Sequence, residues 1–203
     1  CGNQAAQPSV GSSVPSSAPP IQSSVPSSLP TQPGSSSELP VQPSVPGEPA
    51  PKPPARLDEY FPFEENVYKK YKGTGNEYAE FESYVDFMID GSMQIRTINP
   101  GTITVSVYRL KDGAVTRVHF AGERYFRLNE TAERTGEDIL IKEPIEIGTT
   151  WKAQDGSTRS ITALDVAVDV PAGAYRALEV TTEGNYSVLK DYYAPKVGLV
   201  KRE

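Results

Sequence analysis

Hydrophobic and polar positions alternate along most of the chain from Tyr60 onward. The clearest case is residues 79–90, where Phe81, Val85, Phe87 and Ile89 fall on one face of an extended chain and Glu80, Glu82, Tyr84 and Asp86 fall on the other. A period of two is typical of a β-strand with one buried face. The pattern therefore predicts a strand over residues 79–90.

Short turn signals separate this run from the runs that follow it. Asp90-Gly91, Asn99-Pro100-Gly101 and Lys111-Asp112-Gly113 are typical of tight turns, because glycine adopts positive φ at little cost. Between these turns the alternation continues over residues 92–99, 102–110 and 114–120, with Ile103, Val105 and Val107 sharing one face. Three short turns between alternating runs predict a four-stranded antiparallel meander.

Residues 122–138 interrupt the pattern. They are polar, and no apolar face of either period appears in them. The sequence leaves two interpretations of this segment open: a long loop, or a short helix near residues 130–134.

The alternation resumes at Asp138 and continues to the last residues. It predicts strands over residues 138–144, 151–153, 157–166, 166–170, 174–183, 186–194 and 198–202. Roughly ten strands and almost no helix indicate an all-β domain. Since wide open sheets curl or split, we expect a strongly curved antiparallel meander sheet, such as a half-barrel, a closed barrel or a pair of packed sheets.

Composition divides the chain into two parts. Residues 1–55 hold 14 of the 19 prolines and no aromatic residue, and SSVPSS occurs twice, at 12–17 and 23–28. Such a segment buries too little apolar surface to offset the entropy of ordering it, so we expect a disordered Ser/Pro-rich tether with extended local structure. Residues 56–203 have the size of a single domain and can bury one core.

The net charge of −6 argues against two classes of binding partner. Nucleic-acid binding proteins present basic surfaces, so this acidic balance argues against a nucleic-acid partner. It also argues against binding of anionic lipid by the surface of the domain. No stretch approaches the roughly 18 apolar residues of a membrane span.

The single cysteine, Cys1, excludes an internal disulfide. A catalytic thiol needs a neighbour that lowers its pKa, and none is near in the sequence. Cys1-Gly2-Asn3 followed by a Ser/Pro/Gln-rich tether resembles the start of mature bacterial lipoproteins. The resemblance implies that Cys1 carries a lipid that anchors the protein in a bacterial cell membrane, at its extracytoplasmic face. The alternative is a chain boundary that coincides with a cysteine.

The C-terminal part carries a second resemblance. GTTW at 148–151, VPAGAYRALEV at 170–180 and YYAPKVGLVKRE at 192–203 resemble blocks of uncharacterised bacterial lipoproteins, including the DUF3108-like group, which typically end in YYAPGVGLVK. This resemblance implies a curved antiparallel sheet similar to the LolA/LolB carrier half-barrel, with no settled activity. Lys196 stands where these proteins usually have glycine, which leaves the geometry of that turn open.

Candidate chemistry is sparse. His119 is the only histidine, and in the predicted strand 114–120 it shares a face with Val115 and Arg117, opposite Val118 and Phe120. This place on a strand favours a packing or surface role. A zinc site would need several carboxylates, and no G-x-S-x-G or phosphate-binding glycine motif is present. Glu80, Glu82 and Asp86 share one predicted strand face, which keeps calcium binding and carboxylate-based hydrolysis open as alternatives. We predict no catalytic residue, no metal and no cofactor.

We therefore expect a lipid-anchored extracytoplasmic protein that is not an enzyme and that binds a partner or serves envelope assembly. Its expected partners are the membrane, through Cys1, and a hydrophobic ligand, a peptide or a cell-wall component. One alternative is a carrier of lipid or another hydrophobic ligand in a half-barrel cavity, and another is a hydrolase. An open apolar cavity above ~300 Å³ would favour the carrier, and a filled interior would favour a binding or structural module. Two carboxylates in one cleft with raised pKa would favour the hydrolase.

Overall fold

A computed structural model describes residues 55–75 and 79–203 of the chain. The described residues form one short helix and eleven strands: α1 (Leu57–Tyr60), β1 (Tyr68–Tyr71), β2 (Phe81–Ile89), β3 (Ser92–Ile98), β4 (Ile103–Lys111), β5 (Ala114–Ala121), β6 (Asp138–Lys142), β7 (Thr150–Lys152), β8 (Thr158–Val170), β9 (Gly173–Glu183), β10 (Val188–Ala194) and β11 (Gly198–Arg202). Cys1 and nearly all of the predicted tether lie outside the described residues, and both stay predictions.

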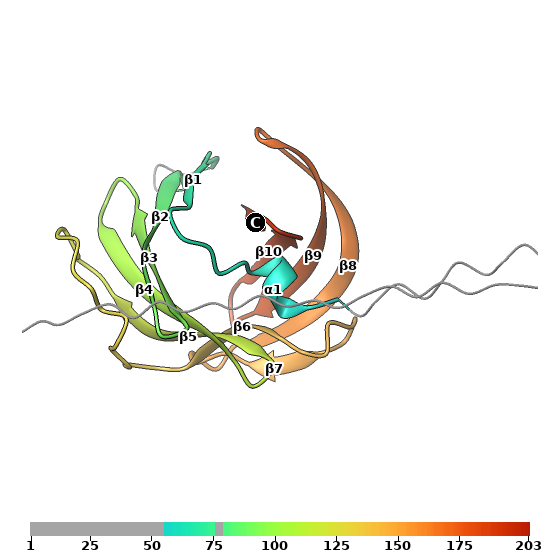
Figure 1. Cartoon of the computed structure of the whole chain (residues 1–203). Coiled ribbons are helices and arrows are strands. Elements are labelled where there is room, and N and C mark those ends of the chain that lie inside the picture. The colour runs from blue at the N-terminus through green and yellow to red at the C-terminus, as the bar shows by residue number, and fades with distance from the viewer. Residues whose placement is uncertain (1–54, 76–78) are drawn as a thin grey trace, which may run out of the picture. The chain divides into compact units, whose positions relative to one another are not determined.

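The strands form two antiparallel sheets in a continuous meander. The first sheet has the order β1-β2-β3-β4-β5-β6, and the second has the order β11-β10-β9-β8-β7. Each strand pairs with its neighbours in sequence, and the meander changes sheet between β6 and β7. Figure 1 shows the first sheet curving strongly, with the second sheet facing it. The expected all-β half-barrel is confirmed, with the addition that the meander is divided into two sheets.

The predicted turns explain the tight hairpins of the first sheet. Asp90 and Gly91 have φ of 50° and 70°, and Asp112 and Gly113 have φ of 53° and 67°. Two successive residues with positive φ are the signature of the type I′ turn, whose twist matches that of antiparallel strands. These Asp-Gly pairs therefore place the turns between β2 and β3 and between β4 and β5.

A β-bulge changes the face assignment in β2. The register with β3 shifts between Val85 and Phe87, so that Phe87 pairs with Gln94 and Met88 pairs with Met93. Because the extra residue reverses the alternation, Phe87 lies on the face opposite Val85, where the guanidinium of Arg127 stacks 4.5 Å from its ring centroid. The prediction that Phe87 shares a face with Phe81 and Val85 is therefore wrong.

Two further strand predictions need correction. The two strands predicted over residues 157–166 and 166–170 form a single long strand, β8, in the structure. Its pairing with β9 shifts register twice. Strand β1 (Tyr68–Tyr71) was not predicted, although residues 67–71 alternate weakly.

The main core lies where the concave faces of the two sheets meet. It combines residues from both sheets with α1: Leu57, Tyr60, Phe61, Met93, Val115, Ile141, Ile145, Trp151, Ile161, Leu178, Val180 and Tyr193. The helix α1 packs on the second sheet through the β10–β11 turn, where the backbone N–H of Lys196 donates to the carbonyl of Glu59 at 2.6 Å.

Within the described part of the chain, no helix has both the length and the hydropathy of a membrane span.

Residues 122–137 form a loop on the convex face of the first sheet. The side chain of Gln94 holds this loop through both ends of its amide: Nε2 donates to the carbonyl of Leu128 at 2.8 Å, and Oε1 accepts from the backbone N–H of Glu130 at 2.7 Å. Gln94 is fully buried under the loop, with Val105 and Val107. Of the two interpretations left open by the sequence, the loop is confirmed, and it leaves the concave face uncovered.

A candidate ligand cavity between the two sheets

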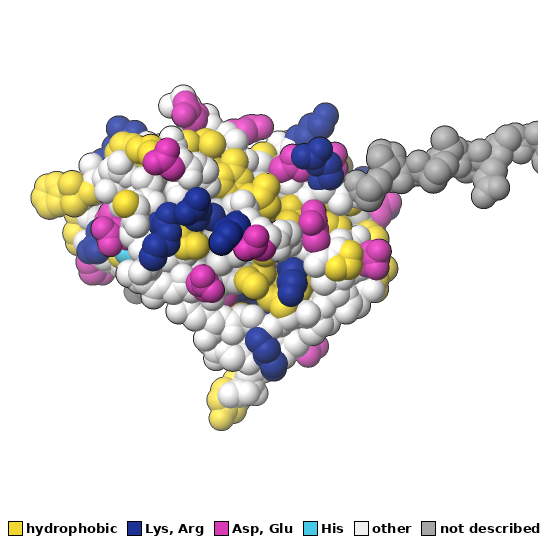
Figure 2. Space-filling model, turned by 60° about the horizontal axis from the view of Figure 1, so that its bottom comes forward, with side chains coloured by type: hydrophobic (Ala, Val, Ile, Leu, Met, Phe, Trp, Pro, Cys, Tyr) yellow, Lys and Arg dark blue, Asp and Glu magenta, His cyan; other side chains and the backbone are white. Residues whose placement is uncertain are grey.

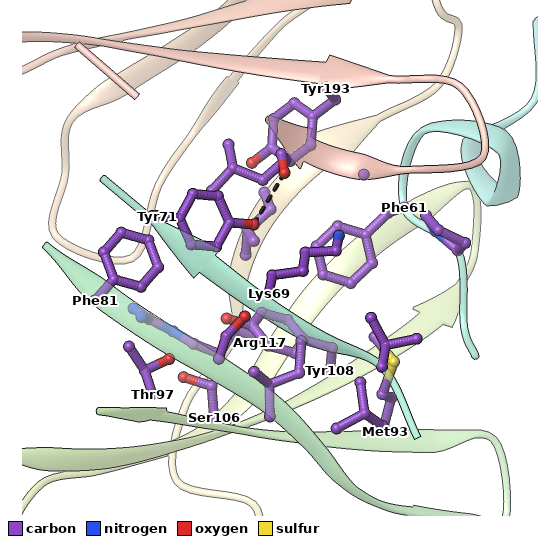
Figure 3. Close-up of a pocket in the computed structure, with 18 of the residues that line it drawn as sticks. Phe61, Lys69, Tyr71, Phe81, Met93, Thr97, Ser106, Tyr108, Arg117 and Tyr193 are labelled. Atoms are coloured by element: carbon purple, nitrogen blue, oxygen red, sulfur yellow. Dashed lines mark hydrogen bonds between the residues drawn. The ribbon is translucent and has the colours of Figure 1, made fainter. Parts of the chain in front are cut away.

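A cavity of about 490 Å³ lies between the concave face of the first sheet and the β10–β11 hairpin. Strands β2, β3 and β4 contribute every second side chain to it, as their period of two requires. These side chains are Phe81, Ser83 and Val85 of β2, Met93, Ile95 and Thr97 of β3, and Thr104, Ser106 and Tyr108 of β4. Figure 3 shows the cavity with its main aromatic and polar residues.

Aromatic rings form much of the wall. The ring of Phe61 lies 5.2 Å from that of Tyr108 and 6.4 Å from that of Tyr193, between centroids, and all three residues line the cavity. Tyr71 stacks on Phe81 with centroids 4.3 Å apart. These packed rings fix the shape of the cavity, and their faces offer apolar surface to a ligand.

The edge strands β1 and β11 belong to different sheets, and two side chains connect them. The ammonium of Lys69 donates to the carbonyl of Val197, and the hydroxyl of Tyr71 donates to the carbonyl of Leu199 at 2.9 Å. Gly198 stands between these two carbonyls with φ of +83°, and a Cβ there would lie 3.2 Å from the Lys69 nitrogen. A side chain at this position would strain the backbone and crowd the Lys69 ammonium, so glycine suits this close approach.

Lys69 differs electrostatically from the two arginines of the wall. Arg117 pairs with Asp138 at 3.0 Å and Arg202 pairs with Asp191 at 2.6 Å, whereas no carboxylate of the described residues lies within ion-pair distance of Lys69. Burial lowers the pKa of Lys69, because it disfavours the charged ammonium, and the nearby charge of Glu64 offsets part of this effect.

Lys196 shows how the C-terminal turn accommodates a residue other than glycine. It has φ of 63°, the left-handed conformation that glycine adopts without strain. The turn thus keeps a glycine-like backbone at the position where the resembling proteins usually have glycine. Its side chain is exposed at the edge of the cavity.

His119 is buried on the convex face, away from the cavity. A register shift at Val118 puts His119 opposite Val107 and Arg117 opposite Tyr108, so the two residues face different sides of the sheet. His119 Nε2 lies 2.7 Å from Glu130 Oε2, and Nδ1 lies 2.9 Å from Thr135 Oγ1. The predicted shared face of His119 and Arg117 is wrong, and the predicted packing role of His119 fits its burial.

The imidazole of His119 thus lies between the hydroxyl of Thr135 and the carboxylate of Glu130 and contacts both. A second hollow, of about 660 Å³, adjoins them, and residues of the 122–137 loop form most of its wall. Glu130 also accepts a hydrogen bond from Arg124 Nε at 2.9 Å. The two contacts of His119 connect the loop to the sheet, so a structural role accounts for this arrangement.

The three acidic residues of the predicted strand 79–90 that kept calcium and hydrolysis open are all ion-paired. Glu80 and Glu82 lie 3.3 and 3.4 Å from the ammonium of Lys70, and the buried Asp86 contacts Arg96 and Arg127. Among residues 55–75 and 79–203, no three acidic, histidine or cysteine side chains gather in a way that could hold a metal ion. The three carboxylates that kept calcium and hydrolysis open thus have basic partners.

The outer surface carries charges of both signs. On the face shown in Figure 2, basic side chains gather near the centre with acidic side chains around them, and the single histidine is barely visible. Exposed apolar residues include Tyr125, Phe126 and Leu128 of the loop, with exposed fractions of 56%, 78% and 58%. The cavity between the sheets combines apolar side chains with Lys69, Arg117 and Arg202.

Comparison with protein-family models, with curated proteins and with solved structures found no match to this chain. The function is therefore argued from the cavity and its residues.

The sequence did not point to the residues of this cavity. The alternation of apolar and polar residues did indicate which side chains of β2 and β3 point inward. However, nothing in the sequence distinguishes a strand face that packs in the core from one that borders a cavity. The sequence does not indicate Lys69 as a cavity residue, because β1 has only four residues and their pattern is too polar to predict a strand.

Proposed function

We propose that the β-domain binds a small ligand with a hydrophobic body in the cavity between its two sheets, and that it performs no chemical step on it. The observation that carries this proposal is the cavity of about 490 Å³ with aromatic and aliphatic walls. Ligand sites typically enclose about 300–1,000 Å³, are mainly apolar and hold a few polar groups that orient the ligand. The cavity therefore favours the carrier over a module with a filled interior.

The distribution of acidic groups supports binding over hydrolysis. Glycoside hydrolysis needs two carboxyl groups flanking the scissile bond. Among the described residues, the lining of the cavity contains one carboxylate, Glu64, which is exposed. Asp138 and Asp191 approach the cavity only as partners of Arg117 and Arg202.

The proposed setting is the extracytoplasmic face of a bacterial membrane, with Cys1 lipidated and the Ser/Pro-rich segment as a spacer. The support for this setting is the resemblance of the first residues to mature lipoproteins. In cells that produce the native precursor, labelled palmitate should enter the protein, and Cys1→Ser should abolish the labelling. Labelling that persists in the Cys1→Ser variant, or no labelling of the wild type, would contradict the anchor.

Filling the cavity should weaken ligand binding. Ile95 points into the cavity from the middle of β3, so Ile95→Trp places an indole in the ligand space. We expect the full chain to bind the neutral fluorescent probe N-phenyl-1-naphthylamine, and Ile95→Trp to weaken this binding by at least about tenfold, the effect of losing roughly 1.4 kcal/mol. Fluorescence titration measures it.

Ile98→Trp is the matched control. Ile98 lies on the same strand but points to the opposite face, and it is absent from the cavity wall. The control should bind the probe as the wild type does. Equal binding by the wild type and both variants would show that the probe binds elsewhere, and absence of binding to the wild type would count against the proposed function.

A further inference from the structure

We propose that the ligand is an amphiphile with a negatively charged head, a carboxylate or a phosphate, and that this head binds the ammonium of Lys69 at the β1–β11 edge of the cavity. The inference rests on the proposed function of the cavity and names the class of ligand. It follows from the position of Lys69, from the hydrogen-bonding capacity that it retains and from the charges around it.

Lys69 lies inside the cavity wall and not on the outer surface. It extends from β1 toward Phe61 in the space bordered by Tyr108 and Tyr193 (Figure 3). Its neighbour Lys70 points to the other side of the strand, where it pairs with Glu80 and Glu82. Adjacent lysines on one short strand thus have different environments: Lys70 is exposed and neutralised by carboxylates, whereas Lys69 is half-buried with no carboxylate of the described residues within ion-pair distance.

The ammonium of Lys69 retains most of its hydrogen-bonding capacity. An ammonium has three donors, and the contact with the Val197 carbonyl uses one. A carbonyl carries no net charge, so it stabilises a half-buried cation less than a carboxylate or phosphate oxygen would. An anionic head could accept from the remaining donors while the link to β11 stays in place.

The charged residues of the cavity lining are mainly basic, whereas the chain as a whole has a negative net charge. The chain has a net charge of −6, yet the described part of the cavity wall contains Lys69, Arg117, Lys196 and Arg202 against a single acid, Glu64. Asp138 and Asp191 neutralise the two arginines in part, which leaves the lysines as the source of positive potential. Next to apolar walls this potential is screened less than in water, and it favours an anion over a neutral or cationic head.

The rest of the wall suits the body of such a ligand. Phe61, Val85, Met93, Ile95 and Leu199 offer apolar surface in the same enclosed space as Lys69. A free anion would gain the contact with Lys69 but would leave this surface empty. The combination therefore favours an amphiphile over inorganic phosphate or a short carboxylate.

The experiment is a competition assay on the full chain with N-phenyl-1-naphthylamine as the bound probe. Dodecanoate, dodecyl phosphate and dodecan-1-ol are the competitors, all below the concentrations at which they form micelles. Both anions should displace the probe with an affinity at least about tenfold higher than that of the alcohol, as a charged hydrogen bond predicts. The ratio between the two anions distinguishes a fatty acid from a lipid phosphate, and acetate and inorganic phosphate should displace nothing.

Substitution of Lys69 tests the contact itself. Lys69→Met keeps the length of the side chain and removes the charge, so it should lower the affinity for both anions by about tenfold or more and leave that for the alcohol within about twofold. Lys69→Arg should retain the preference for anions. Lys70→Met, which removes a lysine from the other side of β1, should behave as the wild type does.

The outcomes separate the two proposals. If the probe does not bind the wild type, the cavity function itself fails. If the probe binds but the alcohol competes as well as the anions do, the cavity function stands and the anionic ligand is excluded. This comparison needs only the wild type, so it decides the matter even if a Lys69 variant does not fold. Equal losses for anions and alcohol in a folded Lys69→Met would also overturn the inference, as would displacement by inorganic phosphate alone.

Discussion

Asp138→Ala is expected to lower the free energy of unfolding by about 3–5 kcal/mol, the usual cost of leaving buried charges without their partner. Asp138 is 4% exposed at the start of β6. Its carboxylate accepts from Arg117 of the first sheet at 3.0 Å and from Arg159 of the second sheet at 2.6 Å. The substitution removes the single acid between two guanidinium groups at the junction of the sheets.

Urea unfolding of the purified chain measures this effect. Trp151 is the only tryptophan and is buried at the same junction, so its fluorescence reports the transition, with circular dichroism as a second probe. Asp165→Ala is the control, because Asp165 also pairs with an arginine, Arg176, but at an exposed position of the second sheet. Its midpoint should stay close to that of the wild type. Similar midpoints for Asp138→Ala and the control would refute the role of Asp138 as the link between the sheets.

Trp151→Ala is expected to cost about 3–5 kcal/mol of stability, as truncation of a large buried aromatic side chain does. Trp151 is 6% exposed in β7, the strand that begins the second sheet. Its indole packs into the main core, and its Nε1 donates to the carbonyl of Ile139 in β6 at 2.8 Å. The residue therefore joins the last strand of one sheet to the first strand of the other by both packing and a hydrogen bond.

Trp151→Phe separates these two contributions. It keeps an aromatic ring in the core but loses the N–H, so we expect a cost near 1 kcal/mol from the hydrogen bond, together with a small packing loss. The Ile139 carbonyl still accepts from Arg159, which limits the penalty. Both variants lack tryptophan fluorescence, so circular dichroism follows their unfolding. If Trp151→Ala were no less stable than Trp151→Phe, packing at this junction would not matter for the fold.

Much of the β-structure could be predicted because its determinants are local. Alternation within β3 and β4 and the Asp-Gly pairs at 90–91 and 112–113 each act over a few residues, so the sequence shows them directly. The predictions failed where a single inserted residue reverses the alternation. Phe87 and His119 both follow bulges, and a bulge is set by the pairing partner, which the sequence of one strand does not contain.

The candidate site depended on contacts that no local pattern records. Lys69 lies against Val197, 128 residues away in the sequence, and the absence of any described carboxylate within ion-pair distance of it follows from how β1 meets β11. In the sequence, Thr97 and Ser106 are ordinary inward-facing strand positions. Only the position of the second sheet makes them part of a cavity wall. The sequence predicted a possible cavity from the expected curvature, but not its size, its wall or its charge.

The sequence by itself determined that this chain forms an antiparallel β-meander, because period-two alternation and turn chemistry are properties of neighbouring residues. It also determined the contrast between the Ser/Pro-rich first part and the domain that follows, since composition alone distinguishes them. Only the tertiary structure decided where the meander divides into two sheets, which face of each strand is buried and that a basic, apolar-walled space remains between them. Those features arise from the packing of residues far apart in the chain, and packing is a property of the folded molecule as a whole.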